Sequence, residues 1–332
     1  MSKHCIREDH ARFAIKRLKQ NFKKGKDERH KVRGIIDLSI EVSFLSFITH
    51  PNIIKLRGLA FGDPINKDHF IILDRLYLTL EEQIHSWKED VFVNSGFCGF
   101  GCLGANKKEL RRIMSDRLVT AYDLSSALRY LHSMNLIYRD IKPDNIGYDV
   151  RGDVKLFDFG LCKELRPKDL HQNGLYHLTG LIGTRQYMAP EVLLGKPYNL
   201  SADVYSFGIL LYEIMAMRRP FSEFNFHEIE QKVGVMGLRP DLTCLYDTTP
   251  DQIIYLIKRC WAKGLRPNFT TIYNQLEHEV SSICSDGQKD FVKNRKQRYH
   301  TSSLDLSISF KKVSEINKKR ALIIEFNEED KK

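Results

Sequence analysis

The side chains with the clearest chemical potential lie together near the middle of the chain. Asp140 and Lys142 stand two positions apart, Asn145 follows in the same short segment, and Asp158 comes soon after it. Transfer of a phosphoryl group requires a carboxylate that orients and deprotonates the attacking hydroxyl, a divalent metal that neutralises phosphate oxygens, and a cation near the donor phosphates. The segment contains side chains of these types, so it favours a phosphotransferase.

These side chains belong to two short motifs. Residues 138–145 read YRDIKPDN, and residues 158–160 read DFG. The chain here resembles the eukaryotic protein kinase family, whose catalytic loop reads HRDxKxxN and whose metal-binding loop reads DFG. The resemblance implies that Asp140 accepts the proton of the substrate hydroxyl and that Lys142 steadies the transferred phosphate. It also implies that Asp158 and the asparagine that ends the first motif, Asn145, hold magnesium.

Motifs nearer the N-terminus follow the order that the family has. Residues 13–16 read FAIK, so Lys16 matches the strand-borne lysine that grips the α- and β-phosphates. Glu41 precedes a His-Pro-Asn segment at residues 50–52 and matches the helical glutamate that pairs with this lysine. The resemblance therefore implies an ion pair between Lys16 and Glu41.

The adenine-binding positions are implied by the same alignment of motifs. Ala14 lies on the strand of the phosphate-binding lysine, and Asp74 and Leu76 occupy the hinge between lobes, where backbone groups would meet adenine. Leu73 would be the gatekeeper. ATP and magnesium are the implied cofactors.

Later motifs match structural positions of the family. Thr184 follows Gly183 and is expected to form hydrogen bonds in the substrate-docking turn. Glu191 ends an Ala-Pro-Glu segment and is expected to pair with Arg266, while Asp203 is expected to brace the catalytic loop from a buried helix. Because the Ala-Pro-Glu segment docks protein substrates in this family, protein substrates are the implied partners and a small-molecule phosphotransferase is disfavoured.

Two residues are expected to regulate activity. Arg139 precedes the catalytic aspartate, and an arginine at this position receives a phosphate placed on the activation segment. Thr179 is the first candidate for that phosphate and Tyr176 the second. An upstream kinase that modifies this segment is therefore an expected partner.

The resemblance also indicates a group within the family. Lys142, two positions after the base, resembles the serine/threonine pattern, whereas residues 187–191 (YMAPE) and 260–261 (CW) resemble the tyrosine-kinase-like group. A serine/threonine kinase of that group reconciles both. Each residue alone has an ordinary explanation as a surface or turn residue, but several motifs in one order are far more specific than any of them.

The sequence departs from the family in two places. The glycine-rich loop that covers the phosphates is expected before Lys16, but residues 1–11 contain no glycine and are too few for a hairpin. We therefore expect either that the true start of the protein lies upstream of Met1, or that this is a shortened kinase whose N-lobe covers ATP only in part. Residues 99–104 spell GxGxxG, but they come after Lys16 and are interpreted as a plain loop. Gly147 stands where the family places an apolar side chain beneath adenine, which predicts a thin floor.

Two hypotheses from different classes follow. The first is an active, ATP- and magnesium-dependent serine/threonine kinase that acts in intracellular signalling. The alternative is a truncated pseudokinase that is weakly active or inactive and acts as a protein-binding scaffold. Thermal stabilisation by ATP with magnesium would separate them, because a ligand that binds only the folded state raises its apparent stability.

Hydrophobic periodicity predicts the elements that position these residues. Strands and one helix are expected before a boundary near residues 74–77, and mostly helices after it. The strands are predicted at residues 12–18, 53–59 and 70–73, and the helices at residues 34–50, 110–131 and 204–217.

This order predicts an α+β fold with two lobes. Residues 1–76 would form a partial, β-rich N-lobe and hinge, and residues 77–284 a larger, mostly helical C-lobe. A Gly- and Cys-rich insertion of loop structure is expected at residues 91–106 and a basic tail at residues 285–332. Residues 19–33 are interpreted as a charged connector.

Composition excludes several classes of protein. The 332 residues are 42% hydrophobic and 28% charged, which is typical of a globular chain. No apolar stretch is long enough to span a membrane, and no secretory signal is visible. Seven scattered cysteines favour reduced thiols and a cytoplasmic or nuclear location. The net charge of +10 is concentrated near both ends, but without interleaved aromatic residues it predicts no specific nucleic-acid binding.

Overall fold

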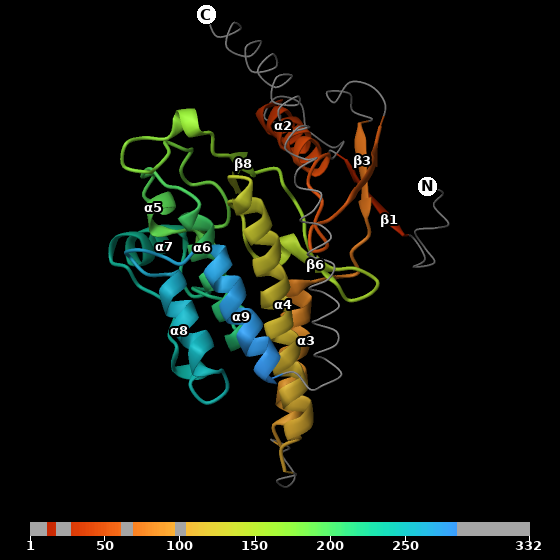
Figure 1. Cartoon of the computed structure of the whole chain (residues 1–332), viewed down its shortest axis with the longest axis vertical. Coiled ribbons are helices and arrows are strands. Elements are labelled where there is room, and N and C mark those ends of the chain that lie inside the picture. Colours follow the sequence, from red (N-terminus) through yellow and green to blue (C-terminus); the bar gives the residue numbers. More distant parts are fainter. Residues whose placement is uncertain (1–11, 18–27, 61–68, 97–103, 284–332) are drawn as a thin grey trace, which may run out of the picture.

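The computed structural model describes residues 12–17, 28–60, 69–96 and 104–283. The expected basic tail at 285–332, most of the GxGxxG segment and the segment before the first strand lie outside these ranges. The described part has a strand-containing lobe and a larger helical lobe (Figure 1). The predicted α+β arrangement of two lobes is thereby confirmed.

The smaller lobe is a three-stranded antiparallel sheet with one helix beside it. The strands are β1 (Phe13–Arg17), β2 (Leu56–Leu59) and β3 (Phe70–Asp74), in the order β1-β3-β2. β1 pairs with β3 along its whole length, so that Ala14 lies opposite Leu73 and Lys16 opposite Ile71. This pairing fixes which residues of β1 lie beside the hinge.

The helix of this lobe, α2 (Glu28–Leu45), corrects the sequence-based boundaries. It begins within the segment interpreted as a charged connector and ends before the predicted end at residue 50. Lys, Arg and Glu are good helix formers, so a run of charges extended the helix where periodicity of apolar residues alone gave no signal. Figure 1 shows α2 beside the sheet.

The second lobe begins directly after the hinge. Thr79, at the end of β4 (Leu78–Thr79), caps α3 (Leu80–Asn94): its hydroxyl accepts from the Glu82 amide, and the Glu82 carboxylate accepts from the Thr79 amide. Because α3 continues to Asn94, the loop expected over residues 91–106 was wrong for its first residues.

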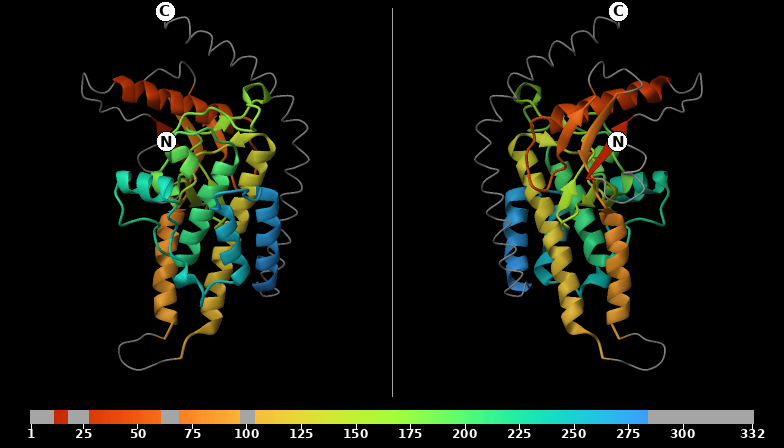
Figure 2. Two further views of the ribbon diagram at one scale, coloured as in Figure 1. Left: turned by 90° about the vertical axis from the view of Figure 1, so that its left-hand side faces the viewer. Right: turned by 90° about the vertical axis from the view of Figure 1, so that its right-hand side faces the viewer.

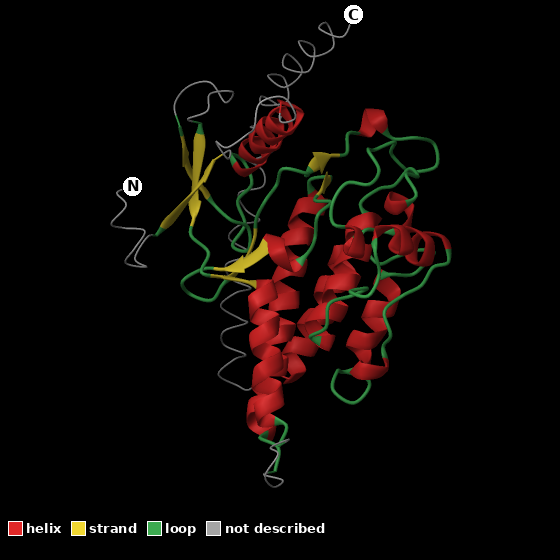
Figure 3. Ribbon diagram, turned by 180° about the vertical axis from the view of Figure 1, so that it is seen from behind, coloured by secondary structure: helices red, strands yellow, loops and turns green. Residues whose placement is uncertain are grey.

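The long helix α4 (Lys107–Ser133) and the buried helix α6 (Ser201–Ala216) form the centre of the second lobe. The side views show the long helices α3 and α4 running away from the sheet and α2 (Figure 2). The longest strands lie in the first lobe, and short ones lie at the boundary and among the loops of the helical lobe (Figure 3). The remaining elements are β5 (Leu136–Ile137), β6 (Ile146–Tyr148), β7 (Val154–Leu156), β8 (Lys163–Glu164), α5 (Pro190–Leu193), α7 (Phe226–Ile229), α8 (Asp251–Cys260), α9 (Phe269–Ile283), a π-helix (Glu230–Val235) and 3-10 turns at Pro143–Asn145, Pro167–Asp169, Arg185–Tyr187 and Thr243–Leu245.

One apolar cluster of the described residues extends through both lobes, and backbone hydrogen bonds also join them. Asn52, in the His-Pro-Asn segment after α2, donates from its side-chain amide to Val154 O at 3.0 Å, and its own carbonyl accepts from the Leu156 amide at 2.8 Å. The N-lobe is thus tied to β7, the strand that leads into the DFG motif. Among the helices of the described ranges, none combines the length and apolarity needed to cross a bilayer.

Candidate active site

Asp203 holds the backbone of the catalytic loop from within α6. Its carboxylate is almost completely buried and accepts hydrogen bonds from the Tyr138 amide at 2.8 Å, the Arg139 amide at 2.9 Å and His132 Nε2 at 2.9 Å. Arg139 has a φ of 71°, a conformation that costs free energy in a residue with a side chain. Asp203 supplies charge-assisted acceptors to the amide of this residue and to the amide before it, so it stabilises the loop that carries Asp140.

The Asp140 carboxylate is fixed on both oxygens. Oδ1 accepts from the Thr184 amide and hydroxyl, both at 3.0 Å. Oδ2 accepts from Asn145 Nδ2 at 2.7 Å and lies 3.0 Å from Lys142 Nζ. Lys142 Nζ also donates to Thr184 Oγ1 at 2.9 Å. A carboxylate, an ammonium and a hydroxyl thus converge on one point, the arrangement that in-line attack by a substrate hydroxyl requires.

A backbone hydrogen bond joins the turn that carries Asn145 to the segment that leads into Asp158. The Phe157 amide donates to Asn145 O at 3.0 Å, which brings the end of β7 beside the turn that carries Asn145. The Asn145 side-chain nitrogen donates to Asp140, which leaves its amide oxygen available as a metal ligand. Asp158 offers a carboxylate from a left-handed conformation, φ 63°.

These donors fit a small, hard cation. Mg²⁺ prefers oxygen ligands and takes only one or two protein carboxylates or amides, with phosphates and water completing the shell. The described residues contain no group of three or more His, Cys, Asp or Glu side chains suited to a metal, so Asn145 and Asp158 would hold the ion together with the phosphates of the nucleotide.

Lys16 and Glu41 form the predicted ion pair. Lys16 Nζ lies 2.6 Å from Glu41 Oε2 and 3.0 Å from Asp158 Oδ1. Glu41 is almost fully buried, whereas the Lys16 side chain is 40% exposed. Burial lowers the pKa of Lys16, but the two carboxylates raise it by more, so the ammonium stays charged. A fixed cation therefore stands between α2 and the DFG motif, where donor phosphates would need it.

The DFG phenylalanine is packed inside the molecule. Phe159 is fully buried, and its ring meets Tyr138 edge to face with centroids 5.3 Å apart. The Tyr138 hydroxyl donates to Phe157 O. Tyr138 occupies the family's histidine position, and its ring and hydroxyl join the catalytic loop to the metal-binding loop. Asp158 consequently faces Lys16, the orientation in which it can meet a metal.

Comparison with protein-family models matches residues 2–280 to the family described as protein kinase domain. The chain belongs to the protein kinase family. It is 33% identical to the probable serine/threonine-protein kinase gdt4 of Dictyostelium discoideum over 80% of this chain and 14% of that protein. It is 30% identical to the serine/threonine/tyrosine-protein kinase HT1 of Arabidopsis thaliana over 71% of this chain and 53% of that protein. The chain thus spans at most about half the length of these relatives.

The hinge of the kinase domain runs from β3 to β4. The Arg75 amide donates to Arg12 O at 3.1 Å, and the Asp74 carboxylate pairs with Arg57 at 2.6 and 3.1 Å. Ala14 is exposed on β1, opposite Leu73. The predicted adenine-binding residues therefore lie together at the junction of the lobes.

The sequence had predicted a gap beneath adenine at Gly147, which has no side chain, and the structure differs from this prediction. A Cβ at this buried position would lie 2.8 Å from Leu76 Cδ1 and 3.1 Å from Leu78 O. The Leu76 side chain already occupies the space into which a side chain at 147 would project.

The activation segment is held to the catalytic loop through Arg139. Its Nε donates to Leu161 O at 2.6 Å. Burial raises the pKa of the Tyr198 hydroxyl, and the nearby Arg139 side chain opposes this rise. Tyr198 in turn donates to Thr179 O at 3.0 Å. Thr179 itself is exposed. Its predicted partner Arg139 is thus linked to it through Tyr198, a residue that no motif had singled out.

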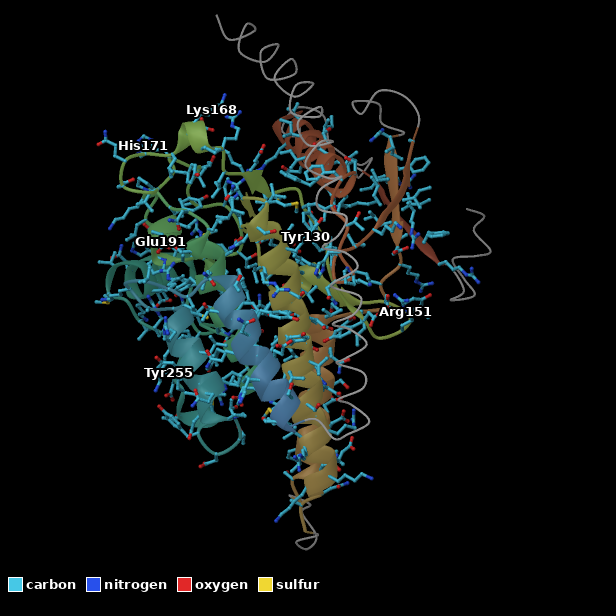
Figure 4. The ribbon with its side chains drawn as sticks, viewed as in Figure 1. Tyr130, Arg151, Lys168, His171, Glu191 and Tyr255 are labelled. Atoms are coloured by element: carbon cyan, nitrogen blue, oxygen red, sulfur yellow. The ribbon has the colours of Figure 1, made fainter. Side chains whose placement is uncertain are left out.

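Lys163, a cation on β8, was also not predicted from the sequence. Burial, together with the nearby guanidinium groups of Arg139 and Arg166, lowers the pKa of Lys163. Mutual repulsion of this kind marks a cluster of positive charge that an anion would relieve. Lys168 and His171 lie further out on the same segment (Figure 4).

The end of the activation segment depends on close packing. Gly183 has φ 107°, and a Cβ there would lie 2.5 Å from Arg139 O, so only glycine lets Thr184 reach Asp140. Glu191, on α5 (Figure 4), accepts two hydrogen bonds from Arg266, at 2.5 and 3.0 Å. The predicted pairing of Glu191 with Arg266 is therefore present.

A buried carboxyl beside this segment had no sequence signal. Tyr187 donates to Glu213 Oε2 at 2.6 Å, and both side chains are buried. Glu213 lies on α6 ten positions after Asp203, in a run of apolar residues that predicts only a buried helix. Its partner became apparent only when α6 and the segment after Thr184 were seen together.

Proposed function

We propose that this chain transfers the γ-phosphoryl group of ATP to serine and threonine hydroxyls of protein substrates. The convergence of Lys142 and Thr184 on Asp140 is the observation that carries the proposal, because Lys142 can neutralise the transferred phosphate while Asp140 accepts the hydroxyl proton. Relatives named as serine/threonine kinases support it. Nothing in these comparisons favours the alternative of an inactive scaffold.

The roles of the remaining residues follow from their positions. Lys16, held by Glu41, would grip the α- and β-phosphates, and Asn145 and Asp158 would hold Mg²⁺. The metal, when bound, neutralises charge on the phosphate oxygens. Adenine would lie against Ala14 and the hinge residues, with backbone groups of Asp74 and Leu76 as its partners. The kinase is proposed to act in the cytoplasm, with the nucleus as the alternative.

Activity is proposed to rise when an upstream kinase phosphorylates Thr179. A phosphate there would add nearly two negative charges, which Arg139 is proposed to bind. The hydrogen bond from Tyr198 to Thr179 O and the proximity of Tyr198 to Arg139 support this role, because they bring the backbone of Thr179 toward Arg139.

The test is phosphoamino-acid analysis of a degenerate peptide library incubated with the purified chain, magnesium and radiolabelled ATP. We expect label on serine and threonine. Lys16→Met serves as the matched control, because it removes the phosphate-binding cation from the same strand and should abolish labelling. Label on tyrosine alone, or equal labelling by the control, would contradict the proposal.

A further inference from the structure

The contact between Leu76 and Gly147 joins the hinge to the strand beneath it. The Tyr77 amide donates to Tyr148 O at 2.9 Å, and Thr79 pairs with Gly147 across β4 and β6. These two backbone attachments hold the residue before them, Leu76, over β6. Figure 1 places β6 between β3 and α3, at the junction of the lobes.

Gly147 is required for space and not for its backbone conformation. It is not among the described glycines with positive φ, so its backbone accepts a side chain. The three nearest obstacles to a Cβ are Leu76 Cδ1 at 2.8 Å, the backbone oxygen of Leu78 at 3.1 Å and Leu76 Cβ at 3.2 Å. Leu76 Cδ1 is the end of a flexible side chain. It could move to admit a Cβ, but the side chain would then leave the space beside Gly147 that it now fills.

We propose that the Leu76 side chain forms the apolar surface beneath adenine, in place of the side chain that residue 147 lacks. The inference rests on the proposed ATP-binding function and identifies a specificity-determining pair for it. Leu76 is half-buried, so its side chain keeps an open face. In this kinase the base would therefore rest on a hinge side chain, and the two positions would carry one large side chain between them.

The pair makes a prediction about folding that needs no ligand. In the wild-type background Gly147→Ala should lower the melting temperature, because its Cβ meets Leu76 Cδ1. In a Leu76→Ala background the same substitution should lower the melting temperature by less, because the contact with Cδ1 is gone while the contacts with Leu78 O and with the Cβ of residue 76 remain. The interaction between the two sites is read from this double-mutant cycle. Equal effects of Gly147→Ala in both backgrounds would overturn the packing on which the inference stands.

The functional test measures affinities for adenosine and for ADP with magnesium by calorimetry. Adenosine reports on the base site without the phosphate-binding groups. Leu76→Ala should weaken both ligands about tenfold, or about 1.4 kcal/mol. Leu76→Ala with Gly147→Leu should return both affinities to within roughly threefold of wild type. The control is Leu242→Ala, which removes a half-buried leucine of the helical lobe and should leave both affinities unchanged.

The outcomes separate this inference from the proposed function. If the wild-type chain binds both ligands and Leu76→Ala binds them equally well, Leu76 does not lie beneath adenine, and the proposed kinase function is unaffected. If the affinity losses of the two single variants simply multiply in the double variant, the proposed replacement of a side chain at 147 by Leu76 is wrong. Failure of the wild-type chain to bind either ligand would overturn both proposals. Melting curves of each variant show that an affinity is measured on folded protein.

Discussion

Glu213 makes the stability of this kinase depend on pH. The pKa of Glu213 is raised to about 7, mainly by burial and also by the neighbouring carboxylates of Glu81 and Asp144, against the opposing effects of the Tyr187 hydroxyl and Arg219. In the unfolded chain the ordinary pKa is 4.5. Between these two values the folded protein keeps a proton that the unfolded chain has released.

The sign and size of the effect follow from this difference. Because the folded state binds more protons, the free energy of unfolding falls as pH rises through the window from 4.5 to about 7. At about 1.36 kcal/mol for each pKa unit, Glu213 costs the folded state about 3 kcal/mol once it is ionised. Glu213→Gln removes the titration and keeps an oxygen that can accept from Tyr187.

The assay is urea denaturation of both proteins at pH 5 and at pH 8. The stability of Glu213→Gln relative to wild type should increase by about 2–3 kcal/mol from the lower to the higher pH. The exposed substitution Glu223→Gln is the control and should show no such increase. A relative stability that is the same at both pH values would refute the reasoning, since the carboxyl would then titrate alike in both states.

Three other substitutions test separate parts of the site. Asp158→Asn should weaken binding of magnesium with ADP by about tenfold in calorimetry, because it removes a ligand charge; equal affinities would contradict the metal assignment. Thr179→Ala should lower the activity of protein purified from its native cell. An unchanged rate, with no phosphate found on the activation segment by mass spectrometry, would rule out the binding of a Thr179 phosphate by Arg139. Arg266→Ala should lower the free energy of unfolding by about 3 kcal/mol, because Glu191 loses both hydrogen bonds from its ion-pair partner. Unchanged denaturation would contradict this.

Much of the candidate site could be predicted because its chemistry is local in sequence. Asp140, Lys142 and Asn145 lie in one turn, so their convergence follows from the motif itself. The pairing of Lys16 with Glu41 spans two elements, but the order of motifs was enough to predict it, and the structure gives a distance of 2.6 Å.

The parts that could not be predicted depend on packing between distant segments. Tyr198 reaches Arg139 and Thr179 only through the fold of the activation segment. The sequence showed that Gly147 lacks a side chain, but not that Leu76 fills its place, because that depends on one side-chain conformation at the hinge. Charged residues before position 34 were misread for a related reason: their charge said nothing against a helix.

The most direct test of the central claim compares wild type with Asp140→Asn in two measurements on the same protein preparations. Peptide phosphorylation should fall by at least about a thousandfold, because general base catalysis contributes on the order of 10²–10⁴-fold and the variant also loses the carboxylate that orients the hydroxyl. Affinity for ADP with magnesium should stay within about threefold of wild type, since Asp140 contacts Asn145, Lys142 and Thr184 and is not proposed to bind the nucleotide. A variant that keeps more than about a tenth of wild-type turnover would contradict the assignment of Asp140 as the base.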